Sequence, residues 1–185
     1  MTPDFFPRAL LGYAPALVLG AGASLVPARG NNWIGLAVLA LSVPASPYLC
    51  AALPSVSFTL IALSALRLLA PGPRVRFGCA PLAAPVLAAC LLYATALGWG
   101  AYDPYDLGFR ARPLLAVLAV FGVVLAATGE SAALALLAAD LLAYAGGLYA
   151  NLWDALIDPV LVLLAVTTLA ARGWRLWVRG GAPAP

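Results

Sequence analysis

Residues 33–70 contain a single charged side chain, Arg67, and three prolines. This apolar run constrains the fold more than any motif does, because a small soluble domain leaves much of its surface in water. The whole chain is similar, with 9% charged residues against roughly 25% in soluble domains. Only helices and closed barrels satisfy backbone hydrogen bonds in a bilayer. Because the apolar runs are continuous and do not alternate, we predict an all-α, polytopic transmembrane helical bundle.

Prolines, glycines and charges divide the chain into six predicted spans, each near the roughly 20 residues that cross a bilayer. The spans are predicted at about residues 4–26, 46–70, 77–100, 113–128, 131–150 and 159–172. In the first, Asp4 is the predicted N-cap, Pro7 falls in the first turn, and Pro15 should kink the helix. Gly20 and Ser24, four residues apart, favour close helix packing.

Residues 33–43 are too short for a span, at about 16 Å with 1.5 Å per residue. We predict a re-entrant or interfacial helix there, followed by a helix that begins with Ser46 as N-cap and Pro47 in its first turn. The alternative is a full span over residues 33–49, kinked at Pro44, which makes seven spans in total.

The connections carry the turn-forming residues. Loops are predicted at residues 27–32, 71–76, 101–112 and 151–158, and a tight hairpin at residues 129–131. The tail of small residues and proline at residues 180–185 is predicted to be disordered. The remainder, residues 1–179, is predicted to form one transmembrane domain.

The arginines orient the bundle, because cytoplasmic loops carry an excess of positive charge. Arginines cluster at Arg67, Arg74 and Arg76 and again at Arg172, Arg175 and Arg179. We therefore predict a bacterial inner (cytoplasmic) membrane protein with both termini in the cytoplasm. Arg67 should snorkel to the cytoplasmic surface.

Aromatic residues are expected near both membrane surfaces. Trp174 and Trp177 suit the inner interface, and Trp99, Tyr102, Tyr105 and Trp153 suit the outer one. In this orientation Arg110 and Arg112 lie outside, which counts slightly against it.

Asp140 is the most informative polar residue. It follows Glu130 by ten residues, so it lies about 15 Å deep at helical rise. A charge near the bilayer centre costs about 3 kcal/mol on insertion scales, so we expect this carboxyl group to be neutral at pH 7.

Further polar residues follow Asp140 at helical spacing, namely Tyr144, Gly147, Asn151, Asp154 and Asp158. If the helix continued, they would form one stripe from mid-membrane to the outer surface. Asp140, Tyr144 and Asn151 are therefore the candidate intramembrane site, as a proton or cation path or a polar seam against a partner. The alternative, which we favour, is that Asp140 bonds a neighbouring helix through Tyr, Ser or Thr.

A second candidate site is the acidic cluster of the outer loops, formed by Asp103, Asp106, Asp154 and Asp158. Paired carboxylates can do acid–base work or hold a hard cation. The structural interpretation is stronger here. Asp103 and Asp158 each precede a proline, as N-caps do, and should each contribute about 1 kcal/mol. Asp106 and Arg110 can pair at i,i+4.

Residues 151–158 resemble the Asp-rich Mg²⁺–diphosphate motif of membrane polyprenyl transferases in their Asp-x-x-x-Asp spacing. The Asn-Asp pair that opens that motif is absent, since Leu152 follows Asn151. The motif also occurs only once, so we do not assign the chain to that family.

No catalytic, metal or cofactor site is predicted from the rest of the chain. There is no histidine, the commonest metal ligand. Cys50, Cys79 and Cys90 lack CxxC spacing and are predicted to be buried structural thiols. No nucleic-acid signature is present, because the arginines lie along membrane boundaries.

Three functions remain. Small size and short loops favour an accessory or assembly subunit of a membrane complex that acts by intramembrane packing, with the bilayer and other membrane subunits as partners. Asp140 supports a small proton- or cation-linked transporter or channel. Only the outer carboxylates support an enzyme acting on a lipid or isoprenoid, so we lean against an enzyme.

Overall fold

The computed structural model describes residues 11–25, 33–52, 56–69 and 76–180, and within these ranges the regular elements are all helices. The chain divides into two compact units. The first comprises Met1–Val75 and Ala135–Asp158, and the second comprises Arg76–Leu134 and Pro159–Pro185. The predicted all-α class is confirmed.

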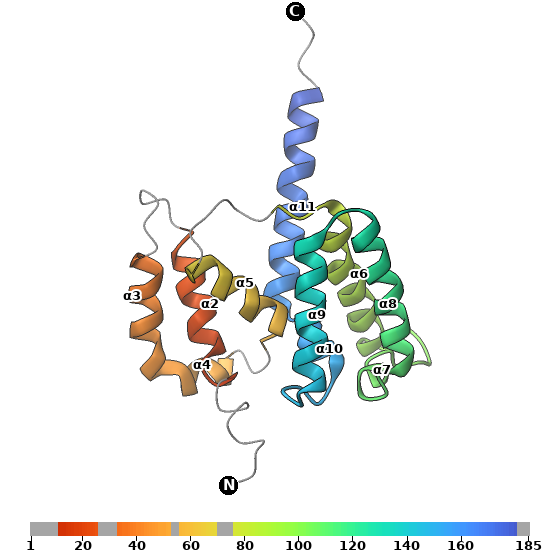
Figure 1. The fold of residues 1–185 in the computed structure, drawn as a ribbon, viewed down its shortest axis with the longest axis horizontal. Coiled ribbons are helices and arrows are strands. Elements are labelled where there is room, and N and C mark those ends of the chain that lie inside the picture. Colours follow the sequence, from red (N-terminus) through yellow and green to blue (C-terminus); the bar gives the residue numbers. More distant parts are fainter. Residues whose placement is uncertain (1–10, 26–32, 53–55, 70–75, 181–185) are drawn as a thin grey trace, which may run out of the picture. The chain divides into compact units, whose positions relative to one another are not determined.

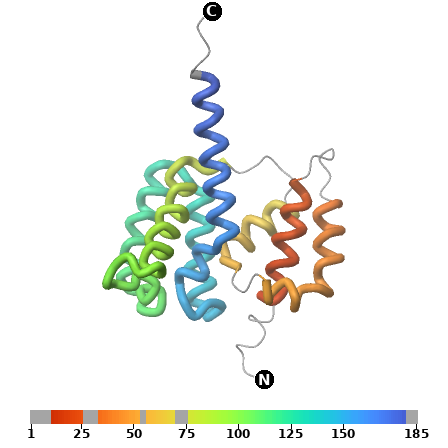
Figure 2. Tube along the Cα trace, turned by 180° about the vertical axis from the view of Figure 1, so that it is seen from behind, coloured from red at the N-terminus to blue at the C-terminus, as the bar shows by residue number. Residues whose placement is uncertain are grey.

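In the first unit, α2 (Ala14–Ala23) and α3 (Trp33–Ser42) lie side by side, as both views show (Figures 1 and 2). Their backbones approach closely at two glycines. A Cβ on Gly20 would lie 2.8 Å from the Gly35 carbonyl oxygen, and one on Gly35 would lie 2.6 Å from that of Gly20 and 2.7 Å from Cβ of Ser24. The close packing expected at Gly20 and Ser24 is confirmed.

The N-terminal helix differs from the prediction. α2 begins at Ala14 with Tyr13 as its N-cap residue, and Pro15 lies in its first turn. Leu11 is helical, and Gly12 and Tyr13 form a turn. The helix is therefore interrupted just before Pro15 and resumes as α2, in whose first turn the proline removes no intrahelical hydrogen bond. Asp4 and Pro7 lie outside the described residues, as do the predicted loops at 27–32 and 71–75.

The stretch Trp33–Ala52 is long and apolar enough to cross a membrane, but it is not one regular helix. α3 is followed by the 3-10 helix η1 (Val43–Ala45) and by α4 (Ser46–Ala52), and the chain bends at η1 (Figure 1). The buried hydroxyl of Ser46 has no hydrogen-bond partner among the described residues, so the predicted cap is wrong.

The predicted helix over residues 46–70 is also wrong. Residues 56 and 57 are not helical, and α5 (Phe58–Leu69) begins after them. Residues 53–55, which include Pro54, lie outside the described residues.

The second unit contains α6 (Cys79–Ala96), α7 (Asp106–Phe109), α8 (Arg112–Ala127) and α11 (Pro159–Gly180). α6 and α11 pack against each other. Nη1 of Arg172 donates a 2.7 Å hydrogen bond to the Phe77 carbonyl oxygen. α11 continues past Arg172 to Gly180, so it is longer than predicted. Gly180 ends this helix, and residues 181–185 of the predicted tail lie outside the described residues.

The predicted hairpin at residues 129–131 is confirmed. Gly129 has a φ of +75°, which glycine adopts without steric cost, and α9 (Ser131–Ala145) follows at once. Glu130 lies against Gly78 at the start of α6, since a Cβ on Gly78 would overlap its carboxylate.

Three helical stretches among the described residues have the length and composition to cross a membrane: Trp33–Ala52, Cys79–Ala96 and Pro159–Arg179. The apolar helices α2, α5, α8 and α9 are shorter. These properties are compatible with membrane insertion, and they do not confirm six spans. The predicted burial of the thiols is wrong for Cys79 and Cys90, which are exposed, and Cys50 is half-buried.

Candidate functional site

The candidate site of the first unit is built on the start of α5, where Ser57 acts as the N-cap. Its Oγ accepts a hydrogen bond from the N–H of Leu60 at 3.2 Å, and its carbonyl oxygen accepts one from Ile61 at 3.1 Å. The side chain thereby satisfies a backbone donor that has no partner inside the helix.

Asp158, which lies 101 positions later in the sequence, forms hydrogen bonds with the same serine. Its Oδ2 accepts hydrogen bonds from the backbone N–H of Ser57 at 2.9 Å and from its hydroxyl at 2.5 Å. Ser57 is 0% exposed and Asp158 3% exposed. The carboxyl group thus lies at the N-terminus of α5, where the helix dipole favours an acceptor.

Asp140 meets α5 two residues further on. Its Oδ2 lies 2.6 Å from Oγ1 of Thr59, which also lies 3.3 Å from the Leu156 carbonyl oxygen. Asp140 is 2% exposed, and its Oδ1 is buried without a hydrogen-bond partner among the described residues. The structure therefore contains the contact to a Ser or Thr group that the sequence favours for Asp140.

Two residues between these acids complete the site. Asn151 caps α10 (Leu152–Leu156), because its Oδ1 accepts a 2.9 Å hydrogen bond from the N–H of Trp153. The hydroxyl of Tyr149 donates to the Val56 carbonyl oxygen at 2.8 Å.

We call these residues the polar cluster: Ser57, Thr59, Asp140, Tyr149, Asn151 and Asp158. It joins α5 to the segment that follows Asp140, within the first unit. Of these, Asp140, Asn151 and Asp158 were predicted as site residues from the sequence, whereas Ser57, Thr59 and Tyr149 were not. Hydroxyl residues at positions 57 and 59, soon after Pro54 in an apolar run, are the signal that could have revealed the first two.

The predicted helical stripe from Asp140 to Asp158 is wrong. α9 ends at Ala145, and Gly147 adopts a φ of +75°, which reverses the chain as glycines do after helices. Asp140 and Asp158 nevertheless bind neighbouring residues of α5, because the chain folds back between them. Tyr144 is half-buried on α9 and makes none of the hydrogen bonds that hold the polar cluster.

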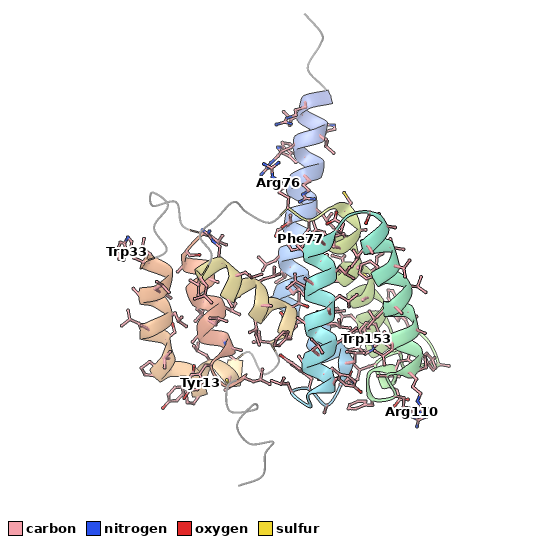
Figure 3. The ribbon with its side chains drawn as sticks, in the orientation of Figure 1. Tyr13, Trp33, Arg76, Phe77, Arg110 and Trp153 are labelled. Carbon is pink, nitrogen blue, oxygen red and sulfur yellow. The ribbon has the colours of Figure 1, made fainter. Side chains whose placement is uncertain are left out.

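Of the outer acidic cluster, two members lie in the second unit and have local roles. Oδ1 of Asp103 accepts a 2.9 Å hydrogen bond from the N–H of Tyr105. Asp106 pairs with Arg110 at 3.7 Å, at the edge of its unit (Figure 3), which confirms the expected i,i+4 pair.

The other two members lie in the first unit, where Asp154 is half-buried on α10 and Asp158 belongs to the polar cluster. Among the described residues, no group of three or more His, Cys, Asp and Glu could hold a metal ion.

Two further residues singled out in the sequence are bonded or buried within the first unit. Nη2 of Arg67 donates to the Ser24 carbonyl oxygen at 2.7 Å, at the C-terminus of α2, where the helix dipole attracts a cation. Its snorkelling to the cytoplasmic surface stays a prediction. Trp153 is only 9% exposed, and its place at the outer interface stays a prediction.

Comparison of the chain with protein-family models, with curated proteins and with solved structures finds no match.

Proposed function

We propose that this protein is a small multi-pass membrane protein that acts as an accessory or assembly subunit by packing within the membrane. The observation that carries this proposal is the use of its buried polar side chains. Asp140 and Asp158 form hydrogen bonds with Thr59 and Ser57, respectively, within the chain. Such bonds hold the subunit together.

The outward surface supports the same proposal. α8 exposes Val117, Val120 and Val123, which lie three residues apart and so near one another on the helix. Exposed apolar surface of this kind marks protein or membrane contacts. Branched side chains lose little freedom when a partner helix packs on them.

Photocrosslinking in cells tests the subunit proposal. A benzophenone amino acid at Val120 should give a discrete protein adduct that is absent at the matched control, Leu125, which is 1% exposed on the same helix. Adducts with lipid alone at Val117, Val120 and Val123 would contradict a subunit that packs through α8.

The topology proposal places six spans in a bacterial inner membrane with both termini in the cytoplasm. It rests on the arginines at the end of α11 and on the positive-inside rule. In a background without Cys50, Cys79 and Cys90, single cysteines at Asn31 and Ala45 should label from the same side. Labelling from opposite sides would show that the intervening segment crosses, which gives seven spans.

A second candidate is a proton- or cation-linked carrier, favoured by the unpartnered Oδ1 of Asp140. An unsatisfied buried acceptor is rare and costly, and intramembrane acids often mark ion pathways. In proteoliposomes a carrier should lose proton-coupled flux in Asp140→Asn, since an amide does not exchange a proton. A subunit should keep its crosslinked partner in the same variant.

The enzyme alternative rests on carboxylates that the structure uses otherwise. Asp103 binds a backbone N–H, Asp106 pairs with Arg110, and Asp158 binds Ser57. We do not propose it further.

A further inference from the structure

The donors and acceptors in the hydrogen bonds of Thr59 depend on whether the Asp140 carboxyl group is protonated. A threonine hydroxyl has one hydrogen to donate and two lone pairs that accept. Oγ1 of Thr59 lies 2.6 Å from Oδ2 of Asp140 and 3.3 Å from the Leu156 carbonyl oxygen. If Asp140 were ionised, both neighbours would be acceptors and would have to share the one hydrogen in a three-centre hydrogen bond, which is weaker to each of them than a separate bond.

A proton on Oδ2 of Asp140 satisfies all three groups. Asp140 then donates to Thr59, and Thr59 donates to the carbonyl oxygen of Leu156. The 2.6 Å distance suits an O–H···O hydrogen bond with either oxygen as the donor. The second acceptor, the Leu156 carbonyl oxygen, favours Asp140 as the donor to Thr59.

The other oxygen of Asp140 points to the same protonation state. An ionised carboxylate would place negative charge on Oδ1, which is buried without a donor among the described residues. Burying such a charge costs far more than burying a neutral carbonyl oxygen. Asp158 differs, since its Oδ2 lies within hydrogen-bond distance of two donors of Ser57.

The charged and titratable neighbours favour the neutral form as well. Tyr149 lies within electrostatic range of Asp140, Asp154 and Asp158, so a charge on Asp140 would be a further negative charge in this region. On α5, Arg67 is eight residues beyond Thr59 and donates to the Ser24 carbonyl oxygen.

We propose that Asp140 is a buried proton-binding site. Its carboxyl O–H donates a hydrogen bond to Oγ1 of Thr59, and the Thr59 hydroxyl donates one to the carbonyl oxygen of Leu156. The site goes beyond both candidate functions and requires neither. In a subunit the bound proton fastens α9 to α5, and in a carrier the same proton is the one exchanged.

Infrared spectroscopy of the purified full chain at pH 7 tests this proposal directly. The carbonyl stretch of a protonated carboxylic acid should be present in the wild type and in the control Asp154→Asn, and absent in Asp140→Asn. In Thr59→Val the band should remain but shift, because its hydrogen-bond partner is gone. A wild type without the band, or a band that survives in Asp140→Asn, overturns the proposal.

The pH dependence of unfolding gives a second measurement. The folded state would hold one proton that the unfolded chain releases above the ordinary pKa of aspartate, about 3.9. Raising the pH should therefore lower the folding equilibrium constant of the wild type by up to about tenfold per pH unit. Asp140→Asn should lack this component in mixed micelles, whereas identical pH profiles for the two proteins overturn the proposal.

Discussion

The two units use their polar side chains differently. In the first, hydrogen bonds from side chains join segments far apart in the sequence, as between Ser57 and Asp158 or Tyr149 and Val56. In the second, the hydroxyls of Thr95, Thr128, Thr167 and Thr168 bond carbonyl oxygens three or four residues earlier in their own helices. These local bonds satisfy the hydroxyl and join no two helices.

This difference shows what an apolar sequence needs to specify its packing. In the second unit the long helices α6 and α11 pack against each other, with a hydrogen bond from Arg172 to the Phe77 carbonyl oxygen at the start of α6. The first unit has short helices, interrupted near Val43 and Ser57, and interruptions leave backbone groups without partners. Side-chain hydrogen bonds satisfy these groups and fix which segments meet.

The largest expected effect is a loss of stability in the first unit. Asp158→Ala removes two hydrogen bonds and leaves the N–H and hydroxyl of Ser57 buried without an acceptor. Each such loss costs about 1–3 kcal/mol, so we expect the free energy of unfolding in mixed micelles to fall by about 3 kcal/mol.

Asp103→Ala is the matched control in the second unit, because it removes one exposed hydrogen bond to Tyr105. It should cost about 0.5 kcal/mol, the low end for a lost cap. The sequence predicts equal costs for the two aspartates, so equal measured costs would contradict the comparison of the two units.

The next effect concerns backbone approach. In Gly35→Ala, the added Cβ would lie 2.6 Å from the carbonyl oxygen of Gly20 and 2.9 Å from Leu68, so α2 and α3 must separate. Overpacking of this kind costs about 1–3 kcal/mol, and thermal unfolding in detergent should move to lower temperature.

Gly173→Ala is the corresponding change in α11, where the new Cβ meets nothing within 4 Å. Alanine in a helix interior is favoured over glycine by about 0.5–1 kcal/mol, so this variant should be more stable than the wild type. A stabilising Gly35→Ala would show that α2 and α3 do not need their glycine contact.

The long helices and the burial of Asp140 could be predicted from the sequence, because apolar length and charge are local properties, whereas Asp158 was expected in an outer loop. It located α6, α8 and the Gly129 hairpin correctly, and it anticipated a Ser or Thr partner for Asp140. It missed where helices are interrupted inside apolar runs. Helical spacing alone cannot distinguish a continuous helix from one that ends just before Gly147, because the spacing of the polar residues in the sequence is the same in both cases.

The hydrogen-bond partner of Asp140 could not be predicted from the sequence for a related reason. Thr59 and Asp140 are separated by 81 positions, and any hydroxyl on a neighbouring helix could have served. Which hydroxyl meets the acid depends on the break before α5, which sets the register of that helix. Local patterns therefore predict that Asp140 needs a partner, and only the fold supplies Thr59.

The smallest expected effect lies at the exposed ion pair of the second unit. Arg110 and Asp106 approach to 3.7 Å, with side chains 82% and 54% exposed, so water and salt screen their attraction. Exposed pairs of this kind contribute about 0–1 kcal/mol. Arg110→Ala and Asp106→Ala should each change the unfolding free energy by less than about 0.5 kcal/mol, and high salt should abolish even that in a double-mutant cycle. A coupling energy above about 1 kcal/mol that persists in high salt would mean that this pair is shielded from solvent, and that the second unit also depends on polar contacts.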